Sequence, residues 1–281
     1  MTDDRATFVR EEMRRDWGRR TRAYADVSAP RNRPCAEALV DLTGIAPGDR
    51  VLDVATGPGV VALLAAARGG PTGSVLATDL APEWEEIVME RAVAAGVADR
   101  VAFRAMGAEA LDLPDATFDA ALCQFGLMFL PDPVQGLREM HRILRPGGRL
   151  GIAVWSTLDR VQHQLVTSTI LAAAPPPAAD QRLPTPLELG EPGLIEQHVA
   201  TAGFQEIAVT RRSFEGVYSE PEDEWRSRTS APTGALAQAI AAIGSQEMER
   251  LHQEVITILE RHRRDGHIHL TSEAILVTAV R

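Results

Sequence analysis

Apolar residues between positions 50 and 155 occur in short, nearly continuous runs that alternate with segments of helical periodicity. The runs predict strands over 50–55, 74–78, 101–104, 118–123 and 149–155. The intervening segments predict helices over 59–68, 82–95 and 132–144. Strands with so few polar residues are buried on both faces, as in parallel sheets covered by helices. The pattern therefore predicts a doubly wound, mostly parallel α/β sheet.

A different pattern flanks this core on both sides. Before it, helices are predicted over 5–27 and from Pro34 to about Leu42. After it, we expect helices over 159–173, 192–202 and much of 221–265, and strands over 204–211 and 270–280. The chain thus divides into an N-terminal helical cover (1–30), the main core (31–155), a lid insertion (156–191), more core (192–212), a helical lid insertion (213–269) and the last core strand (270–281).

The composition excludes several classes of protein. The 281 residues carry a formal net charge of −10, which argues against a nucleic-acid partner. No apolar run reaches the roughly 18 residues of a membrane span, and the charged N-terminus lacks the apolar stretch of a secretion signal. Cys35 and Cys123 suit a reducing compartment, so a cytoplasmic location is expected. All 29 basic residues are arginines, which excludes a lysine Schiff base.

The arginines from Arg5 to Arg33 are interleaved with acids. This mixture predicts a solvated amphipathic helix rather than a track for phosphates.

Residues 51–59 read Val-Leu-Asp-Val-Ala-Thr-Gly-Pro-Gly and precede a helical run. A strand, a glycine loop and a helix N-terminus in this order form a nucleotide-binding corner, since glycines admit the ligand and free N–H groups face it. Asp53 lies just ahead of the glycines and would repel a pyrophosphate there. We therefore expect the ligand to carry an ammonium or sulfonium group.

The series Asp53-x-Ala55-x-Gly57-x-Gly59 resembles motif I of the class I S-adenosylmethionine (SAM)-dependent methyltransferases. Ala55 stands where the family usually has glycine, and it is tolerated provided that its φ is negative. The resemblance implies a seven-stranded sheet whose last strand is antiparallel and inserted near one edge, with helical lid insertions. It also implies that Asp53, Ala55, Thr56, Gly57 and Gly59 contact SAM.

Two further segments fit SAM binding through this resemblance. Asp79 ends the second predicted strand, where a carboxylate accepts hydrogen bonds from ribose hydroxyls, and Leu80 would pack on the adenine. The family usually has an aspartate where this chain has Gly107. Glu109 or a backbone carbonyl then replaces that contact with the adenine amino group, and the Ala108 N–H meets a ring nitrogen.

The end of the fourth strand and the N-terminal helix supply the other candidates. Gln124 and Phe125 lie where ligands bind in open α/β sheets, and we expect Gln124 to hold the methionine moiety. Tyr24 is a candidate for the SAM carboxylate, with hydrophobic docking as its alternative role. Met128 and Trp155 are assigned to the acceptor pocket.

His163 follows the fifth strand and is the candidate for both a general base and an acceptor-pocket residue, because imidazole titrates near neutrality. Its alternative role is that of an ordinary surface residue. No metal site is predicted, since His262, His267 and His269 have no cysteine nearby.

The chain as a whole is similar to the bacterial menaquinone/ubiquinone-biosynthesis-type methyltransferases. This resemblance implies methyl transfer from SAM to a small molecule, in secondary-metabolite or quinone-type biosynthesis, with no membrane partner; a homodimer is compatible with it. One alternative is an NAD(P)-dependent oxidoreductase, because Gly57-x-Gly59-x-x-Ala62 also fits a dinucleotide fingerprint. The others are a SAM-binding enzyme of non-methylating chemistry, such as a cyclase, and a non-enzymatic binding module.

Overall fold

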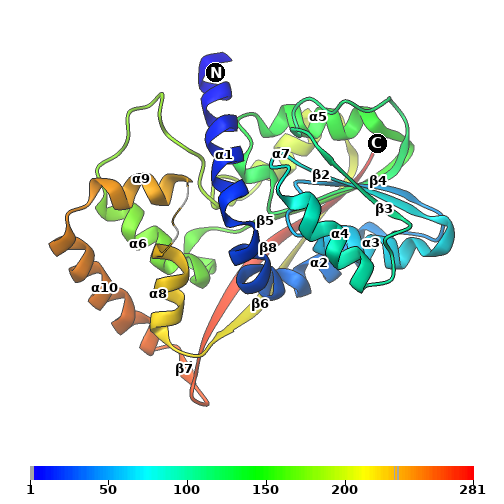
Figure 1. The fold of residues 1–281 in the computed structure, drawn as a ribbon. Coiled ribbons are helices and arrows are strands. Elements are labelled where there is room, and N and C mark those ends of the chain that lie inside the picture. The colour runs from blue at the N-terminus through cyan, green and yellow to red at the C-terminus, as the bar shows by residue number, and fades with distance from the viewer. Residues whose placement is uncertain (1–2, 231, 233) are drawn as a thin grey trace.

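A computed structural model describes residues 3–230, 232 and 234–281 of the protein (Figure 1). Residues 1–2 of the predicted cover and residues 231 and 233 of the second predicted lid insertion lie outside the described part. Within it, one sheet has the strand order β3-β2-β1-β4-β5-β8-β6, and β7 pairs with β8. The strands are β1 Arg50–Val54, β2 Ser74–Asp79, β3 Val101–Ala105, β4 Phe118–Gln124, β5 Leu144–Trp155, β6 Gln205–Tyr218, β7 Arg263–Arg264 and β8 His267–Val280.

The strand directions confirm the predicted sheet. Neighbouring strands from β3 to β5 pair in parallel, and β8 lies antiparallel between β5 and β6. Leu52, Ala121 and Ile152, on β1, β4 and β5, have no solvent exposure. The last strand is thus the antiparallel one inserted near an edge, with the two-residue β7 as an addition.

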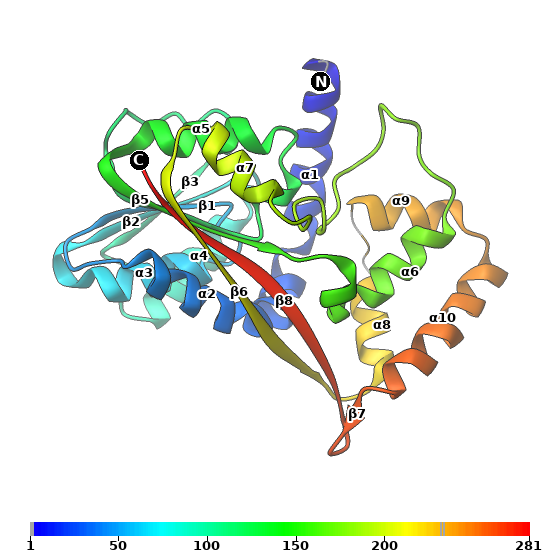
Figure 2. The same cartoon turned by 180° about the vertical axis from the view of Figure 1, so that it is seen from behind.

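Helices cover both faces of the sheet (Figure 2). One face carries α2 (Ala29–Thr43), α3 (Val60–Gly69) and α4 (Trp84–Ala94), and the other carries α5 (Pro133–Ile143) and α7 (Leu194–Thr201). The helix α5 begins where we predicted, because the Asp132 carboxylate accepts a hydrogen bond from the Gln135 N–H at 3.0 Å. This doubly covered sheet explains the apolar strands.

The N-terminal region differs from the prediction of two separate helices. The helix α1 (Asp3–Ala23) continues through a π-helical turn (Tyr24–Ser28) directly into α2. Pro30, not Pro34, occupies the first turn of α2, and Pro34 lies inside the helix. Proline disfavours a helical residue before it without forbidding one. Burial of Cys35 and Leu39 holds the helix in place here.

The strands β6 and β8 extend past the predicted ranges 204–211 and 270–280 and carry a helical lid away from the main core (Figure 2). We use "helical lid" for α6 (Leu165–Ala173), α8 (Pro221–Thr229), α9 (Gly234–Ala242) and α10 (Ser245–Glu260). Buried residues of this lid and of the adjoining ends of β6 and β8 form an apolar cluster separate from the main core: Val166, Ile170, Tyr218, Leu236, Ala239, Leu251, Val255, Leu259, Ile268 and Leu270. The lid therefore has a small core of its own.

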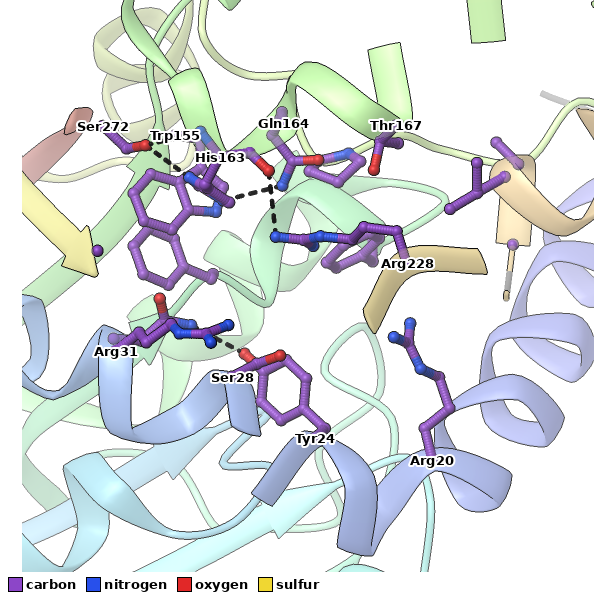
Figure 3. A pocket seen from close by; sticks show the side chains of 18 of the residues that line it. Arg20, Tyr24, Ser28, Arg31, Trp155, His163, Gln164, Thr167, Arg228 and Ser272 are labelled. Atoms are coloured by element: carbon purple, nitrogen blue, oxygen red, sulfur yellow. Dashed lines mark hydrogen bonds between the residues drawn. The ribbon is translucent and has the colours of Figure 1, made fainter. Parts of the chain in front are cut away.

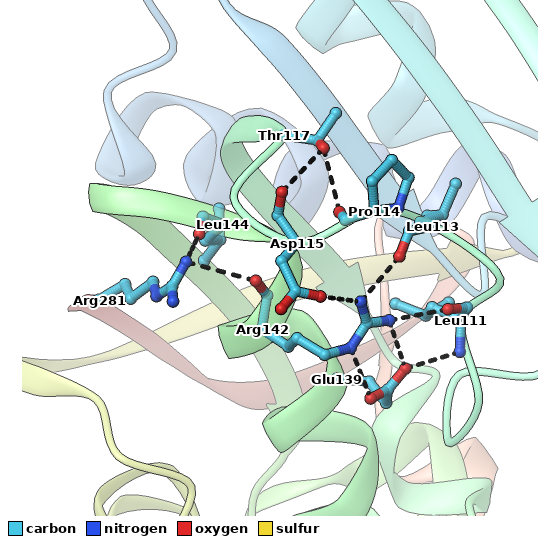
Figure 4. A network of polar contacts seen from close by, with 9 residues as sticks. All are labelled: Leu111, Leu113, Pro114, Asp115, Thr117, Glu139, Arg142, Leu144 and Arg281. Atoms are coloured by element: carbon cyan, nitrogen blue, oxygen red, sulfur yellow. Dashed lines mark hydrogen bonds and ion pairs between the residues drawn. The ribbon is translucent and has the colours of Figure 1, made fainter.

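A network around Arg142 fastens the loop between β3 and β4 to α5 (Figure 4). The Arg142 guanidinium donates to the backbone carbonyls of Leu111 and Leu113 at 2.8 and 2.7 Å. It also donates to the carboxylates of Asp115 and Glu139, at 2.6 Å and 2.8 Å. These contacts hold the loop where it leads the chain into β4.

Three further observations concern the described residues. None of the helices in residues 3–230, 232 and 234–281 is both long and apolar enough to cross a membrane. No cluster of three or more histidine, cysteine or carboxylate side chains in these residues is arranged to hold a metal ion. Cys35 and Cys123 are free thiols, and burial raises the pKa of each to about 12.

Candidate active site

Two adjacent cavities open at the carboxyl ends of the parallel strands. The first, which we call the motif cavity, is bounded by the loops after β1, β2, β3 and β4 and by the N-terminal helix. The second, the lid cavity, lies between the N-terminal helix, β5, β6 and the helical lid. Both cavities are lined by a shared set of residues: Met13, Trp17, Tyr24, Asn32, Phe125 and Phe129.

The structure places most of the predicted site residues on these cavities. The motif cavity is lined by Tyr24, Ala55, Thr56, Gly57, Asp79, Leu80, Gly107, Ala108, Glu109, Gln124 and Phe125. Trp155 and His163 line the lid cavity. Three predicted residues are absent from both linings: Asp53, Gly59 and Met128.

Asp53 lies beneath the glycine loop rather than facing the cavity. One carboxylate oxygen accepts from the Thr56 hydroxyl at 2.6 Å and from the Ala62 N–H, at the start of α3, at 3.0 Å. Burial raises the pKa of Asp53 to about 7. The expectation that this acid faces a cationic ligand is therefore wrong; the carboxylate ties the loop to the helix N-terminus.

Gly59 and Met128 line neither cavity in this structure, and each takes part in packing. A side chain at Gly59 would meet the methyl groups of Val88 on α4 at 3.3 Å, so the glycine permits close contact between helices. Met128 is 2% exposed and belongs to the main core.

Asp79 lies at the motif cavity as predicted. Its two carboxylate oxygens accept from the Gly57 N–H at 2.9 Å and from the Ala81 N–H at 3.0 Å. Burial raises its pKa to about 6 despite these bonds. Gly57 has a φ of +50°, and a Cβ built on it meets nothing within 4 Å. The open space above Gly57, beside a carboxylate with further acceptor capacity, fits a ribose with two hydroxyl donors.

Ala55 departs from the expected backbone conformation. Its φ is +54°, in the left-handed region that favours glycine, so the condition of a negative φ is not met. A Cβ on Gly126 would lie 2.4 Å from the Ala55 Cβ and 3.0 Å from the Cys123 sulfur. The loops after β1 and β4 thus approach so closely that glycine is required at position 126.

The far end of the motif cavity combines apolar side chains with one acid. Leu80, Trp84 and Met106 supply apolar surface, and Trp84 was missed by the sequence analysis. The Glu109 carboxylate accepts from the Asp132 N–H at 2.9 Å and lies 3.5 Å from the Arg10 guanidinium. Burial raises the pKa of Glu109. This end suits a flat apolar ring with polar edges, such as adenine.

Aromatic and amide groups form the wall between the two cavities. The Tyr24 hydroxyl accepts from the Asn32 side-chain amide at 3.1 Å, and the Gln124 amide donates to the Asn32 carbonyl at 2.9 Å. Phe125, with a φ of +56°, stacks on Trp155 with ring centroids 3.8 Å apart. Asn32 was not predicted as a site residue, although it is hydrogen-bonded to both Tyr24 and Gln124, which were.

Three arginines point into the lid cavity (Figure 3). Arg20 comes from α1, Arg31 from α2 and Arg228 from α8. The Arg228 guanidinium donates to the Glu224 carboxylate at 2.8 Å and to the His163 carbonyl at 3.1 Å. The prediction of a wholly solvated arginine face is thus wrong for Arg20 and Arg31.

His163 lies in the wall of the lid cavity, with both ring nitrogens in hydrogen bonds. Nδ1 lies 2.7 Å from the Ser272 hydroxyl and Nε2 lies 2.9 Å from the Gln164 amide nitrogen. Burial, followed by the charges of Arg228 and Arg31, holds the pKa of His163 well below its ordinary value. The ring is therefore neutral and both of its nitrogens are occupied by hydrogen bonds within the protein, which disfavours the general-base role.

Comparison with known proteins agrees with this geometry. A family described as "Methyltransferase domain" matches residues 51–148. A ubiquinone/menaquinone biosynthesis C-methyltransferase, UbiE of Ectopseudomonas mendocina, is 38% identical over 117 residues, which cover 42% of this chain and 46% of that one. An uncharacterised protein of Mycobacterium tuberculosis is 37% identical over 133 residues, or 47% of each chain.

The match over residues 51–148 supports the resemblance to the class I SAM-dependent methyltransferases. The crystal structure of YcgJ from Bacillus subtilis shares the fold over 88% of this chain and 97% of that one, with a TM-score of 0.57 and 18% identity. The chain spans about half the length of the curated relatives it matches. The family match favours SAM over a dinucleotide as the ligand of the motif cavity.

Several residues of the lid cavity could have been found from their spacing along the N-terminal helix. Along the continuous N-terminal helix, cavity-lining residues recur at spacings of one to four and form a single stripe: Met13, Asp16, Trp17, Arg20, Tyr24, Ser28 and Arg31. Such spacing marks one helix face. Arg228 had no comparable signal, because only the folded lid brings α8 to this cavity.

Proposed function

We propose that the protein transfers a methyl group from SAM, bound in the motif cavity, to a small molecule bound in the lid cavity. The observation that carries this proposal is the shared wall, in which Tyr24, Phe125 and Phe129 line both cavities. Two ligands on either side of such a wall are held next to each other. Proximity and orientation supply much of the acceleration of a two-substrate reaction.

The residues of the motif cavity suit the parts of SAM. The Asp79 carboxylate would accept from the ribose hydroxyls, beside the open space at Gly57. Leu80 and Met106 would contact the adenine ring. Tyr24 and Gln124 lie at the end of the cavity next to the lid, where the methionine part would be held. When bound, SAM supplies an activated methyl group on a sulfonium.

The protein then contributes binding, orientation and exclusion of water. Phe125 and Trp155 supply stacked apolar surface next to the wall, and the helical lid covers the acceptor. A dry site favours displacement because the sulfonium charge disappears in the transition state. Similarity to the quinone-biosynthesis relative supports a role in quinone-type or secondary-metabolite biosynthesis.

The test has two parts. Titration calorimetry with S-adenosylhomocysteine should show one site per chain, whereas NADH should not bind; tight NADH binding without the adenosyl ligand would contradict the proposal. Incubation of the protein with [methyl-¹⁴C]SAM and a panel of quinols, phenols and aromatic acids should then give a labelled small molecule. A product that forms without label would instead favour a SAM-binding enzyme of the cyclase type.

A further inference from the structure

The lid cavity contains more positive charge than its nearby acids neutralise. The Arg31 guanidinium lies 3.9 Å from Glu224, which also accepts from Arg228 at 2.8 Å, so a single carboxylate serves two guanidinium groups. Glu224 is buried, with 1% exposure, and cannot turn to solvent. No other acid among the described residues lies within ion-pair distance of Arg31 or Arg228.

Arg20 brings a third guanidinium group to the same cavity. Arg20 lies close enough to Arg228 for the two charges to repel, and burial followed by this repulsion lowers the pKa of Arg20. Asp16 is the acid of the same cavity near Arg20, and its carboxylate also accepts from the Gly234 N–H at 2.6 Å. Arginine stays protonated in proteins. Three cations facing Asp16 and Glu224 therefore leave one net positive charge.

The remaining polar groups of the cavity do not cancel this charge. His163 is neutral, because burial and the nearby arginines hold its pKa well below its ordinary value. Burial raises the pKa of Tyr218 to about 12, so its phenol is neutral as well. Glu215, at the edge of the cavity, is paired with Arg264 and lies 3.1 Å from His269.

The donors of these arginines are placed to receive a ligand. The Arg31 guanidinium carbon lies 4.0 Å from the centroid of the Tyr218 ring, a cation–π contact that helps to hold this side chain in place. Arg228 has five N–H donors, and its bonds to Glu224, His163 and Tyr218 leave the others for a ligand. In Figure 3 the guanidinium groups of Arg20, Arg31 and Arg228 converge on the same space.

Next to these cations the cavity is apolar and partly flat. Phe125 and Trp155 form a stacked pair with an interplanar angle of 11°. Leu171, Leu236 and Leu270 supply aliphatic surface from the lid side. The cavity thus combines a flat apolar region with a cluster of fixed cations.

We propose that the acceptor is an organic carboxylate with a flat apolar body, whose carboxylate is bound by Arg20, Arg31 and Arg228 while its body lies against Trp155 and Phe125. The inference rests on the proposed function, since it names the substrate class of the same site. A monoanion matches the single excess charge, and guanidinium groups bind carboxylates through paired, charge-assisted hydrogen bonds. A neutral quinol would leave that charge unpaired in the covered cavity.

The experiment compares three probes of one shape. The full chain, saturated with S-adenosylhomocysteine, is titrated by calorimetry with 2-naphthoate, with the neutral 2-naphthamide and with 2-naphthyl phosphate. We expect 2-naphthoate to bind at least about tenfold more tightly than the amide, because it alone forms charge-assisted bonds without excess charge. Equal affinity for acid and amide, or tighter binding of the phosphate, overturns the carboxylate assignment.

Variants identify the residues responsible. In Arg31→Gln and in Arg20→Gln the preference for 2-naphthoate over the amide should fall at least about fivefold, with the amide affinity unchanged. Arg33→Gln is the matched control, since Arg33 is exposed on the same helix and pairs with Glu37 at 2.8 Å. A preference that survives in both Arg31→Gln and Arg20→Gln contradicts the proposal.

Titration with S-adenosylhomocysteine distinguishes failure of the carboxylate assignment from failure of the proposed function. If the protein binds S-adenosylhomocysteine but does not prefer 2-naphthoate to 2-naphthamide, only the carboxylate assignment is contradicted. If the folded protein binds no S-adenosylhomocysteine, the proposed function itself is contradicted. Arg228 is left unchanged in these variants, because removing it would strand the buried Glu224 charge and destabilise the lid.

Discussion

The motif cavity and the lid cavity are built in opposite ways. The first is formed largely by loops that follow neighbouring parallel strands of one sheet, and its key bond joins Asp79 to Gly57, 22 residues away. The second draws Arg20, His163 and Arg228 from three distant parts of the chain. A contiguous motif can be recognised from sequence, whereas a site assembled from distant segments depends on how the lid folds.

The electrostatics of the two cavities also differ. The motif cavity presents the acids Asp79 and Glu109, whose pKa values burial raises. The lid cavity presents arginines, which do not titrate near neutrality. One cavity therefore suits a ligand with hydroxyl donors and a positive centre, and the other suits an anion. This contrast gives two tests of whether the cavities act as separate sites, and the tight loops of the motif cavity give a third test, of stability.

The largest expected effect follows from Asp79→Ala. The affinity for S-adenosylhomocysteine should fall about a hundredfold, because two charge-assisted hydrogen bonds of about 1.5 kcal/mol each are lost. Calorimetry measures this loss, and the thermal unfolding midpoint shows whether the variant is folded. Binding of 2-naphthoate to the lid cavity should not change.

Asp112→Ala is the matched control, because the Asp112 side chain is 93% exposed and pairs with Arg104 on the surface. An unchanged adenosyl affinity in folded Asp79→Ala would contradict the ribose role. A parallel loss of 2-naphthoate binding would show that the two cavities are not separate.

The second effect concerns the close approach of the loops after β1 and β4. Gly126→Ala should lower the free energy of unfolding by about 2 kcal/mol, since the new Cβ would lie 2.4 Å from that of Ala55. The double variant with Ala55→Gly should recover part of this loss, because it removes that clash and the strain of alanine at a φ of +54°. Urea denaturation measures both.

Gly244→Ala serves as the control, since Gly244 has an ordinary backbone conformation and a Cβ there meets nothing within 4 Å. It should lower stability by no more than about 1 kcal/mol, because glycine is preferred to alanine at a helix N-cap and no clash is added. Stability of Gly126→Ala equal to that of the wild type would disprove the tight contact.

The smallest effect is a pH dependence confined to the motif cavity. The pKa of Asp79 in the free protein is raised to about 6, and ribose hydroxyls donate to its ionised form. A proton thus competes with the ligand, and lowering the pH from 7 to 5 should weaken S-adenosylhomocysteine binding about tenfold. The affinity for 2-naphthoate should stay nearly constant. A flat profile for both ligands would contradict the raised pKa.

Individual residues show where sequence patterns were sufficient. The strands, the cap at Asp132 and the position of Asp79 follow from local patterns, because burial on both faces and helix capping constrain nearby residues directly. The sequence correctly predicted that Asp53 lies at the glycine loop, but its carboxylate faces α3 rather than the cavity. The motif specifies an acid at this position, while packing of α3 decides that its carboxylate faces the helix N-terminus.

The sequence by itself determined the sheet, the glycine loop and the class of ligand bound there, because these depend on residues close together in the chain. The tertiary structure alone decided which arginines line the lid cavity, that Phe125 stacks on Trp155, and that His163 is held neutral. The physical reason is that burial and long-range charge depend on which distant segments pack together. No local pattern carries that information.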